Sequence, residues 1–212
     1  MKKIKNLKVG DHFSLGNLRW IRLGEYSPGN ILAVSTDIVN KLHYTSFRFG
    51  NDNWRNSELN DYLNVTFYNK MINADVNYSN FYNFPDYKTN RGTADFFRPL
   101  TVKEYIKYLE YLPILKEPYW ILTLEPYITI VKEGRAMSIC NEEEYGKSID
   151  EYIGVLPACI LKENTKVNRG IENAFYDRRN RRKWEEHFVY GVKKILEGAN
   201  EKRHQFNIFS RL

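Results

Sequence analysis

Cysteine and histidine are scarce in this chain, which has 2 cysteines and 4 histidines among 212 residues. A small secreted domain stapled by disulfides carries more cysteines, so this scarcity indicates a reducing compartment. Cys140 and Cys159 both lie in apolar, strand-like runs and are predicted to be buried free thiols. Because neither has a His or Cys neighbour at metal-site spacing, we predict no bound metal.

Other signals of function are also missing. No apolar run approaches the roughly 20 residues of a membrane span, and no signal-peptide apolar stretch follows the basic start Met1–Asn6. We therefore expect a cytoplasmic protein with no membrane partner. There is no glycine-rich phosphate loop, no histidine stands in a recognisable motif with Ser or Cys, and the acidic run Glu142–Glu144 lacks calcium-ligand spacing. The sequence predicts no catalytic residue and no cofactor.

Charge is distributed unevenly along the chain. The formal net charge is +6, and residues 168–212 carry 11 Lys and Arg against 6 Asp and Glu, a balance of +5. The residues before them are almost neutral, with a balance of +1. Attraction to a polyanion is therefore expected at the C-terminal end.

The N-terminal part has the pattern of antiparallel strands. Alternating apolar residues on both sides of Gly16-Asn17 predict a hairpin of 7–15 with 18–23. A loop is predicted over 24–30. The wholly apolar run Ile31–Ser35 predicts a strand that is buried on both faces.

The sequence predicts two helices. Ser57 is a candidate N-cap for a helix over 58–71, in which a four-residue repeat forms an apolar stripe: Leu59, Leu63, Phe67 and Met71. We interpret this stripe as core rather than as a cofactor site. Thr101 and Glu104 predict a capping box for a second helix that Pro113 ends. Between the two helices, residues 72–94 are predicted to be a long irregular segment.

From Tyr119 onwards the apolar period returns to two. Short strands are predicted at 119–123, 127–131 and 136–140, an acidic loop follows, and a strand over 153–161 closes the sheet. Two helices among many short antiparallel strands define an α+β fold with long loops.

These signals, in this order, resemble a bacterial and phage domain-of-unknown-function family related to formylglycine-generating enzymes and C-type-lectin-like folds. The segments that carry the resemblance are 18–23 with 31–34, Asn53-Trp-Arg-Asn-Ser-Glu-Leu-Asn-Asp-Tyr-Leu-Asn64 with Phe67 and Tyr68, Asp95-Phe-Phe-Arg-Pro-Leu-Thr-Val-Lys-Glu-Tyr105, 120–123 with 131–134, and Gly154-Val-Leu-Pro-Ala158. The most specific part is Trp54, Ser57, Leu59, Leu63 and Asn64.

The resemblance implies a C-type-lectin-like or formylglycine-enzyme-like module over 1–167 and a basic helical extension over 168–212. Trp54, Ser57 and Asn64 are interpreted as fold-determining. The chain departs from the family pattern at Leu156, where an arginine is usual, and at Leu122-Thr123, where leucine-arginine-serine is usual. The resemblance does not place either cysteine at a catalytic position, so oxidase activity is not expected.

The C-terminal segment contains the candidate contact residues. Asp177–Lys183 has no apolar side chain, and apolar residues at helical spacing follow it. Arginine forks suit phosphate and carboxylate groups, so the candidate contacts are Arg178, Arg179, Arg181, Arg182 and Lys183. Packing of this helix on the body of the chain through Trp184 and Phe188 is the alternative.

The functional hypothesis is a non-catalytic recognition module that binds a macromolecular partner, most simply a protein, through loops 72–94 and 141–152. One concrete form, by fold analogy alone, is a phage or mobile-element inhibitor of a host defence complex. Two alternatives stay open. One is nucleic-acid binding through the arginine-rich helix, and the other is an enzyme with an unfamiliar site, which a deep pocket with convergent polar groups would indicate.

Overall fold

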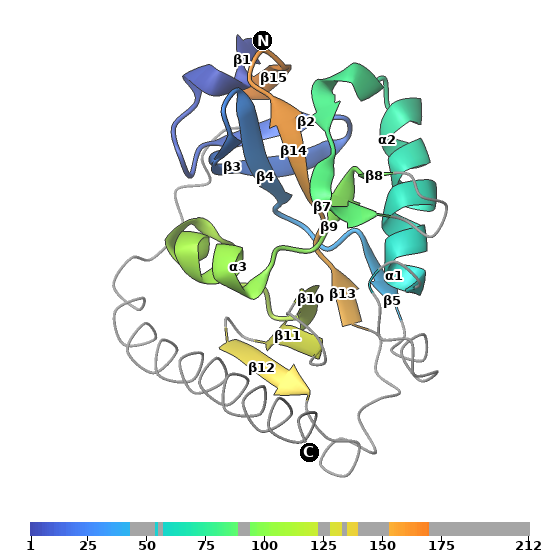
Figure 1. The fold of residues 1–212 in the computed structure, drawn as a ribbon. Helices are drawn as coiled ribbons and strands as arrows, with labels where there is room; N and C mark the ends of the chain where they lie inside the picture. The colour runs from blue at the N-terminus through green and yellow to red at the C-terminus, as the bar shows by residue number, and fades with distance from the viewer. Residues whose placement is uncertain are drawn as a thin grey trace, which may run out of the picture.

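The computed structural model describes residues 1–42, 54, 57–88, 94–122, 128–132, 135–139 and 153–169. Within these ranges the chain forms an α+β fold with two helices and two principal sheets (Figure 1). These helices and sheets confirm the predicted α+β class. Residues 170–212, which hold nearly all of the predicted C-terminal extension, lie outside the described residues.

The larger sheet is antiparallel. Its strand order is β1-β15-β2-β3-β4-β14-β6, and β9 also pairs with β14. The strands are β1 (Lys2–Lys3), β2 (His12–Leu15), β3 (Leu18–Ser27), β4 (Asn30–Ser35), β6 (Phe81–Tyr82), β9 (Phe97–Arg98), β14 (Ala158–Lys162) and β15 (Lys166–Arg169). The predicted hairpin is confirmed, because β2 and β3 pair with Leu15 opposite Leu18. Gly16 takes the positive φ, 60°, that this tight turn requires.

The second sheet has the order β12-β11-β10-β13-β5. Its strands are β5 (Asn40–Leu42), β10 (Tyr119–Ile121), β11 (Ile128–Lys132), β12 (Arg135–Ile139) and β13 (Ile153–Val155). Of the strand pairs described in this sheet, β10–β13 is parallel and the others are antiparallel. A short separate pair joins β7 (Phe84–Lys88) to β8 (Ala94–Asp95).

Two apolar cores lie on opposite faces of the larger sheet. In β4, Ile31 and Ala33 belong to one core, while Leu32 and Val34 belong to the other. Strand β14 alternates in the same way. The prediction that 31–35 forms a strand buried on both faces is therefore confirmed, because each face of this strand has a helix-bearing layer against it.

The first helix covers one of these cores. It runs without a break through α1 (Glu58–Asp61), a π-helical segment η4 (Tyr62–Phe67) and α2 (Tyr68–Asn73). The predicted stripe Leu59, Leu63, Phe67 and Met71 is buried. A four-residue repeat drifts by about 40° per step around an ordinary α-helix. The wider turns of η4 reduce this drift, so the stripe keeps facing the sheet.

The second helix covers the other core. It comprises α3 (Val102–Tyr108) and a 3₁₀ turn η6 (Leu109–Tyr111), and its predicted capping box is present. Thr101 Oγ1 accepts a hydrogen bond from the Glu104 backbone N–H at 3.2 Å, and Glu104 Oε2 accepts from the Thr101 N–H at 2.9 Å. Its inner side chains are buried or partly buried against the second core: Val102, Tyr105, Ile106, Tyr108, Leu109 and Leu112.

Three predictions of local structure are wrong. Residues 24–30 are mostly strand, because β3 continues to Ser27. The segment 72–94 is not irregular throughout: it contains the end of α2, the 3₁₀ turn η5 (Tyr78–Asn80), β6 and β7. The run 153–161 is not one strand, because β13 and β14 belong to different sheets. Strand β15 also runs two residues past the predicted module boundary at 167.

Candidate functional site

Trp54, Ser57 and Asn64 make their contacts inside the fold. The Trp54 indole N–H donates to Asp95 Oδ2, and Asn60 Nδ2 donates to the same oxygen at 3.0 Å. Ser57 Oγ accepts from the Asn60 N–H at 3.0 Å, which confirms the N-cap. Because Asp95 and Asn60 are fully buried, this network ties the start of the helix to β8.

A second buried polar pair joins Arg98 to Glu104. Arg98 Nη1 and Nη2 donate to the two Glu104 carboxylate oxygens at 2.8 and 2.7 Å, and the guanidinium lies 3.9 Å from the centroid of the Phe84 ring. Burial alone would raise the pKa of Glu104, but Arg98 and Thr101 hold that pKa below its usual value. The pair is therefore ionised and anchors α3 to β9.

Cys159 is a free thiol buried in the first core, as predicted. Burial raises its pKa well above the usual value, so its nucleophilic thiolate form is disfavoured. Cys140 lies outside the described residues. Within the described ranges, no three or more His, Cys, Asp or Glu side chains gather where they could hold a metal.

The feature of the described surface that best fits a binding site lies where the two sheets meet. Strands β4 and β14 pair in the larger sheet, and the same two chain segments continue as β5 and β13 in the second. In the larger sheet the pairing stops with Val34 opposite Ala158, and it starts again in the second sheet with Asn40 opposite Val155. Five residues, 35–39, therefore face only two, 156–157, and the excess residues form a bulge at this seam.

Hydrogen bonds hold this bulge in one conformation. The Ser35 N–H donates to Pro157 O at 2.9 Å and the Val39 N–H to Val155 O at 3.0 Å. At its tip, Arg19 donates to both Asp37 carboxylate oxygens, with the shortest contact from Nη2 to Oδ1 at 2.9 Å. Thr36 Oγ1 also donates to Asp37 Oδ2 at 2.8 Å. The tip is fixed even though Arg19 and Asp37 are both about half exposed.

The segment after η6 forms the facing wall. Lys41 Nζ pairs with Glu117 Oε2 at 2.8 Å and links β5 to that wall. Gly154 allows the close packing beneath it. A Cβ at this position would stand 2.6 Å from Ile38 Cδ1 and 2.8 Å from Pro118 O.

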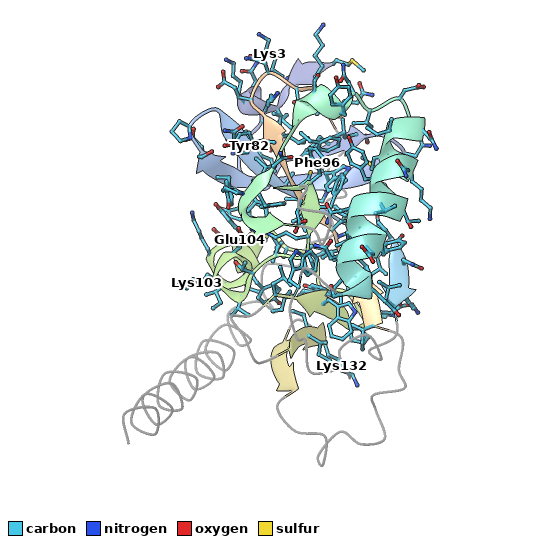
Figure 2. The ribbon with its side chains drawn as sticks, turned by 45° about the vertical axis from the view of Figure 1, so that its right-hand side comes forward. Lys3, Tyr82, Phe96, Lys103, Glu104 and Lys132 are labelled. Carbon is cyan, nitrogen blue, oxygen red and sulfur yellow. The ribbon has the colours of Figure 1, made fainter. Side chains whose placement is uncertain are left out.

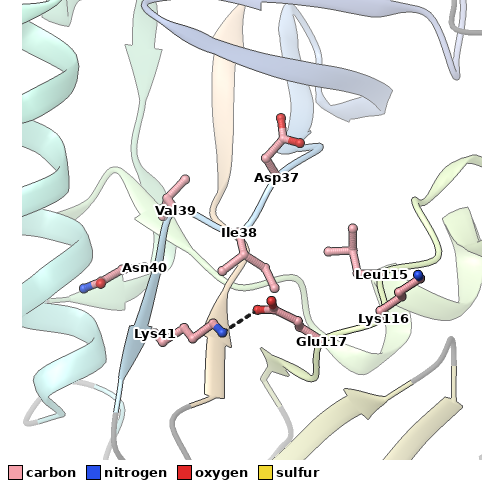
Figure 3. Close-up of a pocket in the computed structure, with 8 residues that line it drawn as sticks. All are labelled: Asp37, Ile38, Val39, Asn40, Lys41, Leu115, Lys116 and Glu117. Carbon is pink, nitrogen blue, oxygen red and sulfur yellow. Dashed lines mark ion pairs between the residues drawn. The ribbon is translucent and has the colours of Figure 1, made fainter.

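Between the two walls is a groove, open to solvent, with a volume of about 660 Å³ (Figure 3). It is lined by Asp37, Ile38, Val39, Asn40, Lys41, Leu115, Lys116 and Glu117. We call the groove that these residues line the seam groove. Ile114, next to it in the chain, has 60% of its surface exposed. An apolar floor with charges of both signs at the rim suits contact with a protein better than contact with a polyanion.

None of the sequence-based predictions includes the residues that line the seam groove. The predicted contact residues Arg178, Arg179, Arg181, Arg182 and Lys183 lie outside the described residues, as does the predicted loop 141–152. Of the other predicted recognition loop, residues 72–88 and 94 are described, and they do not line the groove.

Comparison with known proteins gives no relative. No protein-family model, no curated protein and no solved structure matches this chain. Among the described residues, no helix is both long enough and apolar enough to cross a membrane.

Proposed function

We propose that the chain is a non-catalytic recognition module, with a C-type-lectin-like or formylglycine-enzyme-like body, and that it binds a segment of a protein partner in the seam groove. The observation that carries the proposal is the groove itself: an apolar floor of Ile38 and Leu115 between a bulge held by hydrogen bonds and a facing segment held by the Lys41–Glu117 ion pair. Walls that are ordered before binding reduce the entropy lost on association.

The charged rim suggests the character of the partner segment. Asp37 and Glu117 stand on opposite walls, each with a basic partner, and Lys116 adds an exposed positive charge. A segment with an apolar anchor flanked by charges of both signs would match this rim. The anchor would supply most of the affinity, and the charges would set orientation and association rate.

Two matched double variants of the full chain test the proposal. I114E/K116E changes an exposed aliphatic residue beside the groove and a lysine that lines it, and V65E/K70E makes an equivalent pair of changes on the exposed face of the first helix. Partners are captured from cells of the native host with each protein, identified by mass spectrometry, and then titrated as purified proteins. A groove partner loses about tenfold or more in affinity with the first variant only, equivalent to at least about 1.4 kcal/mol. A partner that binds all three proteins equally would place recognition elsewhere.

Nucleic-acid binding is the second candidate function, favoured by the balance of +5 in residues 168–212. Fluorescence anisotropy with labelled oligonucleotides at two salt concentrations tests it, because each phosphate contact steepens the fall of affinity with salt. The matching variant replaces Arg178, Arg179, Arg181, Arg182 and Lys183 with glutamine in the full chain. Absence of binding at low salt would eliminate this candidate.

A further inference from the structure

The N-terminal segment forms one edge of the larger sheet, far from the seam groove. Among the described strands, β1 pairs with β15 alone, with Lys3 opposite Lys166 and Lys2 opposite Val167. The segment then crosses the β14–β15 turn, where the Ile4 N–H donates to Thr165 O at 2.9 Å and the Lys5 N–H to Glu163 O at 3.1 Å. Ile4 is fully buried and fixes the segment to the first core.

These contacts bring four exposed lysines together at the edge of the sheet. We call Lys2, Lys3, Lys5 and Lys166 the lysine edge. Lys5 pairs with Glu163 at 3.2 Å, and the other three make no ion pair with any described residue. Lys3 and Lys166 are directly opposite in an antiparallel pair, so their side chains leave the same face of the sheet, while Lys2, opposite Val167, lies at the same edge but leaves the other face. Like charges in this arrangement destabilise strand pairing.

We infer that the lysine edge is a surface for the phosphodiester backbone of nucleic acid. A phosphate between Lys3 and Lys166 would turn their repulsion into attraction to a shared anion. Lysine side chains meet phosphates as point charges and do not need a pocket. The site therefore reads backbone charge, not base sequence.

The position of the lysine edge in the chain supports the same ligand. Strand β15 ends at Arg169, and the first arginine of the C-terminal cluster, Arg178, follows nine residues later. Nine residues span at most about 30 Å, so one nucleic acid could contact both sets of cations. The inference thus deepens the nucleic-acid candidate function and rests on it for the class of ligand, but it concerns different residues.

Lysines on edge strands also have a purely protective role, since they discourage pairing with strands of other molecules. That role involves no anion. The two roles differ in what the lysines do to the salt dependence of nucleic-acid affinity, which can be measured directly.

The experiment uses the full chain in three forms besides the wild type. K2Q/K3Q/K166Q removes the three unpaired charges of the lysine edge, and K103Q/K107Q/K132Q removes three exposed charges elsewhere, two of which are visible far from Lys3 in Figure 2. The third form is the arginine-cluster variant described above. Each is titrated against fluorescein-labelled duplex DNA and single-stranded RNA of about 20 nucleotides, between roughly 50 and 200 mM salt. Circular dichroism checks that all the variants fold.

For duplex DNA, we expect K2Q/K3Q/K166Q to weaken binding about tenfold at low salt. The log–log salt slope should fall by about 1 to 2 units, since Lys3 and Lys166 share one phosphate, Lys2 adds at most one more, and each phosphate contact contributes roughly 0.9. The control variant should show no more than the small effect of lower net charge. Equal values for these two variants would overturn the inference. If only the arginine-cluster variant loses binding, the nucleic-acid function stands without the lysine edge; if the wild type binds neither probe, both fail.

Discussion

The side chain of Asn64 pairs with the backbone of Phe97 in both directions. Asn64 Oδ1 accepts from the Phe97 N–H at 3.0 Å, and Asn64 Nδ2 donates to Phe97 O at 2.9 Å. The same Oδ1 accepts from the Phe96 N–H at 2.8 Å. Asn64, which lies in the π-helical segment η4, thereby supplies β9 with hydrogen bonds of the kind that a neighbouring strand would supply.

Replacing Asn64 with alanine should reduce the free energy of unfolding by about 2 to 4 kcal/mol. The substitution leaves two N–H groups and one carbonyl without partners beside the buried Phe97, and each such group costs about 1 to 3 kcal/mol. Better helix propensity offsets a small part of the loss. Urea denaturation measures the change. Asn69→Ala, an exposed position on the same helix, should leave stability unchanged or slightly higher, and equal losses at the two positions would refute the role of Asn64.

Glu104 should make stability depend on pH in the acid range. Its pKa in the folded state lies below the ordinary value of 4.5. The ionised carboxylate therefore favours the folded state. This contribution is complete above pH 4.5 and is lost as pH falls through the folded-state pKa.

The variant Glu104→Gln tests this dependence. At neutral pH it leaves the Arg98 charge buried without a counter-charge and should cost about 3 to 5 kcal/mol. The difference from wild type should shrink as pH falls below 4.5, because the wild-type carboxyl then becomes neutral as well. Chemical denaturation over this pH range gives both values. Glu110→Gln, at an exposed position in the following turn, is the control, and a pH-independent difference for Glu104→Gln would contradict the assignment.

Much of the local structure was predictable because its signals are short-range. The capping box of Thr101 and Glu104, the Ser57 cap and the Gly16-Asn17 turn each depend on residues within four positions of one another. The stripe from Leu59 to Met71 likewise follows from the period of a helix. For these elements the local preference and the tertiary packing favour the same conformation.

The seam groove was not predictable in the same way. The run 153–161 is apolar throughout, so nothing in its pattern shows that it changes sheets between Val155 and Ala158. The bulge at 35–39 exists only relative to a partner more than a hundred residues away. The lysine edge has the same origin, since Lys3 and Lys166 become neighbours only through strand pairing. Register over such separations is not encoded in local periodicity.

Cys159 should resist alkylation for as long as the protein stays folded. The thiol is fully buried, and burial raises its pKa well above the ordinary range. The reagent therefore cannot reach the sulfur, and the reactive thiolate form is not populated. Iodoacetamide at about pH 8, near the pKa of a free cysteine, should leave the Cys159 peptide unmodified in native buffer and modify it fully in concentrated urea. Peptide-level mass spectrometry measures this site separately from Cys140. Rapid modification in native buffer would show that the core opens there.

Gly154→Ala should disturb the seam groove and lower stability by about 1 to 3 kcal/mol, the usual cost of overpacking. The new methyl group would meet both Ile38 Cδ1 and Pro118 O. The Ile38 side chain can move aside, but the Pro118 carbonyl cannot, because it accepts the Gly154 N–H at 2.9 Å and so holds β13 against the segment before β10. Shortening Ile38 should therefore rescue only part of the loss.

A double-mutant cycle of Gly154→Ala with Ile38→Ala, followed by thermal unfolding, separates these two contacts. We expect the double variant to be more stable than the sum of the single effects predicts, since the Ile38 clash is relieved, yet clearly less stable than Ile38→Ala alone. If the double variant matched Ile38→Ala, the crowding would come from the side chain alone. If there were no coupling, Ile38 would not pack against Gly154, and the floor of the groove would be built differently from the contacts described above.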